Sequence, residues 1–233
     1  VALAQQIGQQ ISINMSTDSL GGVFVTWQDK RGGVDDDIYG THVGADHNIV
    51  SPGSGVSIVS EGGAQFAKSI EYAGNNEAFI CWSDARLGEN IDIYGQRLDT
   101  SMQPAFQENG IPIANTSGLE TRPRATFVNN TISFVTWKSG DENARILYQF
   151  VDHTGLVFGD AKSVADFDAI QTAPRVKRSN SGEVFIQWKD LRFDAVDGDI
   201  FMQKIDSNGD ALWSNGVQVD PSDGVNYSGR FSA

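Results

Sequence analysis

The chain has little of several residue types that carry familiar chemistry. Its one cysteine, Cys81, excludes an intrachain disulfide and lies in the apolar run AFICW, where a buried structural thiol is favoured over a nucleophile. Its 3 histidines show no ligand spacing such as HExxH. No apolar run is long enough to span a bilayer. Only 17 Lys and Arg face 30 Asp and Glu, and the net charge of −13 argues against binding to nucleic acid or anionic membranes.

A motif recurs along the chain. The stretches WQDKR, WSDAR and WKDLR begin at Trp27, Trp82 and Trp188, and a weaker copy, WKSGD, begins at Trp137. The spacing between successive tryptophans is roughly 50–55 residues, which is typical of repeat architectures. A motif present in every unit is usually structural, whereas a catalytic site is normally a single asymmetric cluster of residues.

Each unit divides into four short runs rich in β-branched and aromatic residues, separated by Gly, Asn, Asp and Ser. No segment has a sustained helical period with caps. Four antiparallel strands per repeat predict an all-β fold, the β-propeller, in a single domain over 1–233 with repeats at about 9–60, 64–116, 120–168 and 171–221. A β-sandwich is the main competing fold, but it predicts no recurrence of the motif.

The two ends of the chain are out of phase with the repeats. Val1–Ala4 aligns with the fourth strand of a unit, and Asn226–Ala233 aligns with a first strand. The sequence therefore predicts a partial terminal blade. Two alternatives stay open: a five-bladed propeller with an atypical last blade, or a piece of a longer polypeptide whose exposed strand edges another segment or chain covers.

The acidic loop after Trp27, Trp82 and Trp188 carries an Asp and an Arg, and a later Asp precedes the third strand. An arginine held between two carboxylates can fix a tight loop through charge-assisted hydrogen bonds. We therefore predict a structural motif. Its residues are Trp27, Asp29, Arg31, Asp37, Trp82, Asp84, Arg86, Asp92, Trp188, Asp190, Arg192 and Asp199.

The same loops offer an alternative. Asp35, Asp36 and Asp37, and likewise Asp197 and Asp199, carry hard oxygen ligands suited to calcium. The ligand ladder of an EF-hand is absent. No cofactor is firmly implied, and calcium stays open as a metal.

The first strands of the second, third and fourth units and of the C-terminal fragment carry a basic residue, and first strands line the central channel of a propeller. These residues are Lys68, Arg124, Arg175 and Arg230. A ring of cations could hold an anionic ligand such as a uronic acid or phosphate. The alternative is that each cation pairs with a repeat aspartate, since buried charges are generally paired.

The motif W-x-D-x-R followed by D-I-Y-x-Q, best seen in WSDARLGENIDIYGQRLD, resembles the blade repeat of secreted bacterial β-propeller proteins. The resemblance covers nearly the whole chain, although WKSGD departs from it. It implies export and a repeat scaffold, and no specific chemistry. The architecture also loosely resembles that of the sialidases, but their S-x-D-x-G-x-x-W order is absent, so sialidase activity does not follow.

These observations lead to two functional hypotheses. The first is a non-enzymatic propeller, secreted or on the cell surface, that binds carbohydrate or protein with loops at one rim, serves adhesion or scaffolding, and has neighbouring domains in a longer chain. The alternative is a propeller glycoside hydrolase or lyase with carboxylates at the channel mouth. A glycosidase pair is recognised by its separation in space, which the sequence does not contain.

Overall fold

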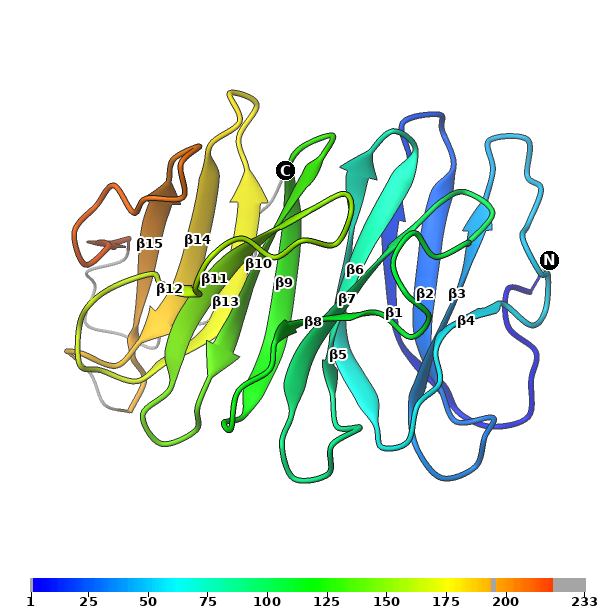
Figure 1. The fold of residues 1–233 in the computed structure, drawn as a ribbon, viewed down its shortest axis with the longest axis horizontal. Coiled ribbons are helices and arrows are strands. Elements are labelled where there is room, and N and C mark those ends of the chain that lie inside the picture. The colour runs from blue at the N-terminus through cyan, green and yellow to red at the C-terminus, as the bar shows by residue number, and fades with distance from the viewer. Residues whose placement is uncertain (1, 194–195, 220–233) are drawn as a thin grey trace.

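The computed structural model describes residues 2–193 and 196–219 and confirms the all-β prediction. The described strands form four antiparallel sheets, each of four strands that follow one another in sequence order. The sheets lie side by side in sequence order, from the N-terminal sheet at one end of the molecule to the sheet of β14 and β15 at the other (Figure 1). This is the repeated four-stranded blade of a β-propeller.

The first sheet contains β1 (Gln10–Thr17), β2 (Val23–Asp29), β3 (Asp37–Val43) and β4 (Val56–Val59). The second contains β5 (Gln65–Gly74), β6 (Glu77–Asp84), β7 (Asp92–Leu98) and β8 (Ile111–Ala114). The third contains β9 (Glu120–Asn129), β10 (Ile132–Ser139), β11 (Arg145–Asp152) and β12 (Lys162–Ser163). The fourth contains β13 (Gln171–Arg178), β14 (Val184–Asp190), β15 (Asp199–Ile205) and β16 (Val217–Gln218).

The hydrophobic core lies between neighbouring sheets, as radial packing requires. One cluster joins the first and second sheets, with Phe24 and Ile38 packed beside Ile80 and Trp82. Two further clusters join the second to the third sheet and the third to the fourth. Second and third strands supply most of these side chains, because their alternating residues face the adjacent sheet.

Backbone hydrogen bonds join the sheets at the start of the inner strands β5, β9 and β13. The Gln65 amide donates to the carbonyl of Asp36 at 2.6 Å, and the Glu120 amide donates to that of Ile91 at 2.7 Å. The Gln171 amide repeats the bond with Ala144 at 2.9 Å. In each case the acceptor lies just before the third strand of the preceding sheet, so each first strand is positioned by its predecessor.

The N-terminal prediction is wrong. Residues 2–4 are not part of a strand, and the backbone amide of Gln5 donates to the carbonyl of Gly53 at 2.8 Å. The segment therefore lies against the β3–β4 connection, where one loop bond replaces a strand ladder. The predicted first strand at Asn226–Ala233 lies outside the described residues.

Candidate functional site

The motif of the second sheet is a closed hydrogen-bonded unit. The buried carboxylate of Asp84 accepts from the indole Nε1 of Trp82 at 2.7 Å and from the backbone amide of Arg86 at 2.9 Å. The Arg86 guanidinium adds bonds from Nε at 2.9 Å and Nη2 at 2.6 Å. Nη2 also donates to the Asn109 carbonyl at 2.9 Å, and the guanidinium lies 3.9 Å from the ring centre of Tyr94. These contacts link the motif loop to the β7–β8 connection and to the β7 side chain Tyr94.

The first and fourth sheets repeat the unit. Trp27 Nε1 donates to Asp29 at 2.8 Å, and Trp188 Nε1 donates to Asp190 at the same distance. Burial alone would raise the pKa of Asp29, but the hydrogen bonds from its arginine and tryptophan outweigh burial and lower that pKa. For the equivalent Asp190, burial is likewise outweighed by Arg192 and Trp188, which lower its pKa, and both carboxylates are thus held as hydrogen-bond acceptors, which agrees with a structural role.

Asp92, the later aspartate of the second sheet, differs from the prediction. Asp92 lies opposite Asp84 in the β6–β7 ladder, but the side-chain hydrogen bonds of Arg86 described above go to Asp84 and Asn109. Burial, Glu120 and Asp84 raise the pKa of Asp92. The arginine is therefore held by one carboxylate and a carbonyl rather than between two carboxylates.

The third sheet performs the same task with a different residue. Its loop has Ser139 where the other sheets have the motif aspartate, and the Glu120 carboxylate accepts from Trp137 Nε1 at 2.5 Å and from Ser139 Oγ at 3.0 Å. Thr116 Oγ1 donates to the same carboxylate at 2.7 Å. Glu120 and Ser139 are ladder partners, as Gln65 and Asp84 are in the second sheet. The acid has moved to the neighbouring strand, which explains why WKSGD departs from the repeat.

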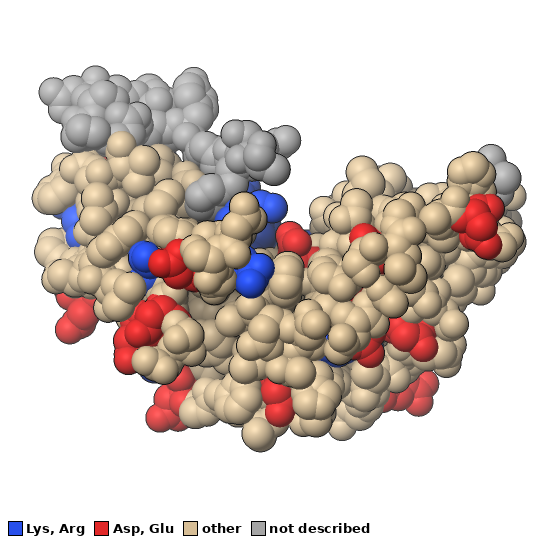
Figure 2. Space-filling view, turned by 90° about the horizontal axis from the view of Figure 1, so that it is seen from above, with Lys and Arg blue, Asp and Glu red and all other residues tan. Residues whose placement is uncertain are grey.

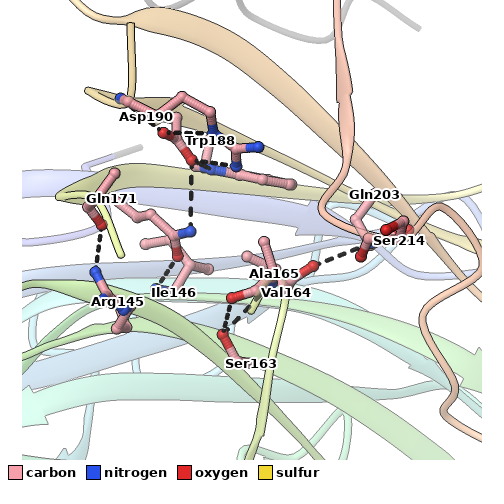
Figure 3. Close-up of polar contacts among 12 residues, drawn as sticks. Arg145, Ile146, Ser163, Val164, Ala165, Gln171, Trp188, Asp190, Gln203 and Ser214 are labelled. Atoms are coloured by element: carbon pink, nitrogen blue, oxygen red, sulfur yellow. Dashed lines mark hydrogen bonds and ion pairs between the residues drawn. The ribbon is translucent and has the colours of Figure 1, made fainter. Parts of the chain in front are cut away.

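Glutamines complete the joints between sheets. The Gln171 side chain accepts from the amide of Ile146 in the third sheet at 3.0 Å and donates to Asp190 in the fourth at 3.4 Å (Figure 3). Gln203 donates to the Val164 carbonyl at 3.0 Å. The repeated polar residues therefore hold adjacent sheets together as well as closing their own loops.

The aspartates considered for calcium do not form a metal-binding group in the structure. Among residues 2–193 and 196–219, no group of three or more His, Cys, Asp or Glu side chains could hold a metal ion. Asp36 instead has Lys30 as a neighbour, with 3.9 Å between its carboxylate and the ammonium. Calcium binding by Asp35, Asp36, Asp37, Asp197 and Asp199 stays a prediction without a described ligand cluster behind it.

A cavity of about 1090 Å³ lies against the four inner strands β1, β5, β9 and β13. Figure 2 shows a hollow on this side of the molecule, with Lys and Arg side chains on its wall. The inner strands break register near their beginnings. Three non-glycine residues take left-handed backbone there, Ser12 (φ 54°), Arg122 (φ 56°) and Ala173 (φ 53°). Such bulges re-aim the side chains that follow, and they are frequent beside functional sites.

The predicted channel cations are partly brought together. Lys68, Arg124 and Arg175 all line the cavity, whereas Arg230 lies outside the described residues. Arg124 and Arg175 occupy equivalent positions, opposite Thr136 and Gln187, immediately after their bulges. The position of Lys68 is one residue earlier, because Ser69 is the residue paired after the bulge in β5.

Lys68 therefore has a distinct environment. Its side chain is buried, and its ammonium donates to the carbonyl of Ser12 in the first sheet, while Asn14 donates to the Lys68 carbonyl at 2.9 Å. Burial lowers the pKa of Lys68 to about 8. The contacts of Lys68 therefore link β5 to β1, and they favour a structural role over ligand binding.

The Lys68 environment predicts a pH dependence. The folded pKa of about 8 lies below the usual 10.5, so the unfolded chain holds more protons between these values and stability rises with pH across that window. Below about pH 8 both states carry the proton and the penalty is constant. We expect the unfolding free energy of wild type, relative to Lys68→Met, to increase between pH 8 and 10.5 in urea titrations. Parallel pH curves for the two proteins would contradict the assignment.

Glu71 and Lys177, which no sequence motif indicates, also line the cavity. Both hold the same repeat position, opposite Phe79 and Phe185 in their ladders, two residues beyond Ser69 and Arg175. Strand alternation puts residues two apart on one face, so this pattern could have found them. Burial raises the pKa of Glu71, and the ammonium of Lys177 acts in the opposite direction.

The fold has similar solved structures, although no family model matches the chain and no curated protein matches it significantly. An endo-arabinase from Bacteroides thetaiotaomicron VPI-5482 aligns with a TM-score of 0.59 and 11% identity, over 95% of this chain and 82% of that one. An alpha-L-arabinanase from Penicillium chrysogenum complexed with arabinobiose aligns with a TM-score of 0.59 and 11% identity, over 91% and 72%. A thermostable family-43 glycoside hydrolase aligns with a TM-score of 0.55 and 10% identity, over 94% and 78%.

The chain has the fold of these propeller enzymes. The predicted non-enzymatic binding or scaffolding role is thereby corrected, because the similar structures are glycoside hydrolases and favour the alternative hypothesis. Structural similarity at about 10% sequence identity shows the fold only, so any catalytic chemistry has to be argued from the residues of this chain. The specific blade motif has no counterpart shown in these comparisons. No helix among the described residues is long and apolar enough to cross a membrane.

Proposed function

We propose that the chain is a glycoside hydrolase whose active site is the cavity on the inner strands. The observation that carries the proposal is the half-buried Glu71, a carboxyl group with a raised pKa in this cavity. The similar arabinanases and family-43 hydrolase support carbohydrate as the substrate class. A large concave site with a perturbed carboxyl group is the arrangement expected of an active site.

Glu71 is suited to the role of general acid. A carboxyl group whose pKa burial raises is suited to donate a proton to the glycosidic oxygen as the bond from that oxygen to the anomeric carbon breaks. Water then adds to the anomeric carbon and gives up a proton to the Glu71 carboxylate, which restores the acid, so the overall reaction is hydrolysis. Among the described residues that line the cavity, Glu71 is the only carboxylate, and the proton donor is therefore assigned to it.

The test is a glycosidase screen followed by one substitution. Wild-type protein is assayed on arabino-oligosaccharides, xylo-oligosaccharides and oligogalacturonates by release of reducing ends. For a substrate that is cleaved, Glu71→Gln is expected to lower kcat/KM about 100-fold or more, because the amide cannot donate the proton. Glu89→Gln, a change of the same kind in an exposed loop, is the control and leaves kcat/KM unchanged.

Two results would contradict the proposal. One is the absence of cleavage across the panel by a protein with intact thermal unfolding. The other is equal activity of wild type and Glu71→Gln. Action outside the cell, as the resemblance to secreted propellers implies, stays part of the proposal and is tested by the distribution of the protein between culture medium and cells.

A further inference from the structure

The cavity is cationic in an acidic protein. The whole chain has a net charge of −13, yet the described lining contains one carboxylate, Glu71, and six basic side chains. The basic residues are Lys68, Arg122, Arg124, Lys138, Arg175 and Lys177. Blue side chains lie on the wall of the hollow in Figure 2, while red ones are scattered over much of the rest of that view. The excess of positive charge is therefore local to the inner strands.

Some of these cations already have clear partners. Lys138 pairs with Asp141 at 3.1 Å, and Lys68 donates to the Ser12 carbonyl. The two arginines after the bulges, like Lys68, donate to backbone carbonyls. Arg124 Nη1 donates to the Pro123 carbonyl at 2.8 Å, and Arg175 Nη1 donates to that of Pro174 at 3.1 Å. A carbonyl acceptor is uncharged, so the bond to Pro123 fixes the Arg124 side chain without neutralising its charge.

The arginines also act on each other. β9 and β13 are neighbouring inner strands, and Arg124 and Arg175 hold equivalent positions in them. Burial and then the Arg175 guanidinium lower the pKa of Arg124, and Arg122 adds to the effect. Gathering like charges costs free energy in the unliganded protein, and a bound anion offsets that cost.

We propose that the cavity binds a glycan bearing sugar carboxylates, with Arg124, Arg175, Arg122 and Lys177 as its recognition groups. The proposal rests on the hydrolase function above and specifies its substrate class. Guanidinium groups match a carboxylate through paired, charge-assisted hydrogen bonds. Glu71 holds the same repeat position as Lys177, so an acidic sugar bound at the cations lies in the same cavity as the proton donor.

The experiment measures binding separately from turnover. Trigalacturonate, its methyl ester and 3′-sialyllactose are titrated by calorimetry into the Glu71→Gln protein, which retains the cations and lacks the proposed acid. Trigalacturonate or sialyllactose is expected to bind, and the uncharged methyl ester to bind roughly tenfold more weakly than its acid, because it loses charged hydrogen bonds. Added salt weakens binding of the acid and leaves binding of the ester unchanged. The two acids distinguish uronic from sialic sugars as the source of the carboxylate.

Two exposed cavity cations supply the matched variants. Arg122→Gln and Lys177→Gln, each in the Glu71→Gln background, are expected to weaken binding of the acid several-fold without changing binding of the ester. Lys30→Gln removes the same charge outside the cavity lining and is expected to have no effect. Because these side chains are exposed, thermal unfolding should match that of the background, and Arg124→Gln, at a partly buried position, is a secondary variant.

The outcomes separate the two proposals. Acid-selective binding without cleavage of any glycan overturns the hydrolase and supports the cationic site. Glu71-dependent cleavage of a neutral arabino-oligosaccharide, with no binding of either acid, supports the hydrolase and overturns the cationic site. Equal affinity for trigalacturonate and its methyl ester, or unchanged binding in both cavity variants, also overturns the inference.

Discussion

Replacing Asp84 with alanine is expected to lower the free energy of unfolding by about 3–5 kcal/mol. The substitution removes the acceptor for the Trp82 indole and for three donors of Arg86. The Trp82 side chain is fully buried and the Arg86 side chain is 16% exposed, so neither gains full hydration in compensation. Breaking a buried ion pair on one side leaves an uncompensated charge, which costs more than the pair contributes.

Urea unfolding followed by tryptophan fluorescence measures the Asp84 effect. Glu89→Ala, in the exposed part of the same loop, is the control and should change stability by less than about 0.5 kcal/mol. Asp84→Asn keeps the shape and one acceptor oxygen, so an intermediate loss is expected. Wild-type stability in Asp84→Ala would show that the motif does not stabilise the blade.

The second large effect is expected in the third sheet, where the acid lies on the other strand. Ser139→Asp would set a second carboxylate beside buried Glu120 and is expected to cost about 3–5 kcal/mol. The ladder partner of Ser139 is Arg145, but its guanidinium already donates to Asp168 and to the Ala169 carbonyl. Glu120→Gln alone removes the charged acceptor of Trp137, Ser139 and Thr116, at about 1–3 kcal/mol. The double variant recreates the Gln and Asp ladder pair of the other sheets and should recover most of both losses.

A double-mutant cycle in urea measures this coupling. The predicted coupling energy is favourable and several-fold larger than the few tenths of a kcal/mol found for independent sites. The same two changes made at distant positions, Glu89→Gln with Ser101→Asp, serve as the control and should be additive. Additive losses of unfolding free energy for Glu120→Gln and Ser139→Asp would show that a carboxylate at position 139 does not replace the one at position 120.

The sequence predicts those features well that depend on contacts between residues close in the chain and that recur in several repeats. The recurring Trp, Asp and Arg identified the strand that ends at the motif, because each of these side chains bonds within a few residues of its own loop. The same logic failed in the third unit, where the acceptor for Trp137 is Glu120, 17 residues earlier in the chain. The pairing of β9 with β10 brings Glu120 to Trp137, and this pairing cannot be read from a motif that lies within one strand.

The cavity was harder to predict for a related reason. The prediction of Arg124 and Arg175 rests on a basic residue in a first strand, and the same rule includes Lys68, which lies within the bulge of β5, one position before Ser69, the equivalent of the two arginines. A one-residue slip sends a side chain to the other face of a strand. Glu71 lacked any motif of its own, and its raised pKa comes from burial that only the assembled sheets produce.

The backbone bonds at the joints between sheets have a consequence for how such a chain can change length over evolution. Each joint uses the same groups, an inner-strand amide and the carbonyl just before the third strand of the previous sheet, at Asp36, Ile91 and Ala144. Gene duplication or deletion of one whole unit would bring an equivalent amide to an equivalent carbonyl. The new junction would form the same backbone hydrogen bond, whereas a cut within a unit would leave the amide and the carbonyl without their partners. The backbone hydrogen bonds therefore favour gain or loss of whole units. The side chains that face the cavity take no part in these bonds, so they can differ from unit to unit.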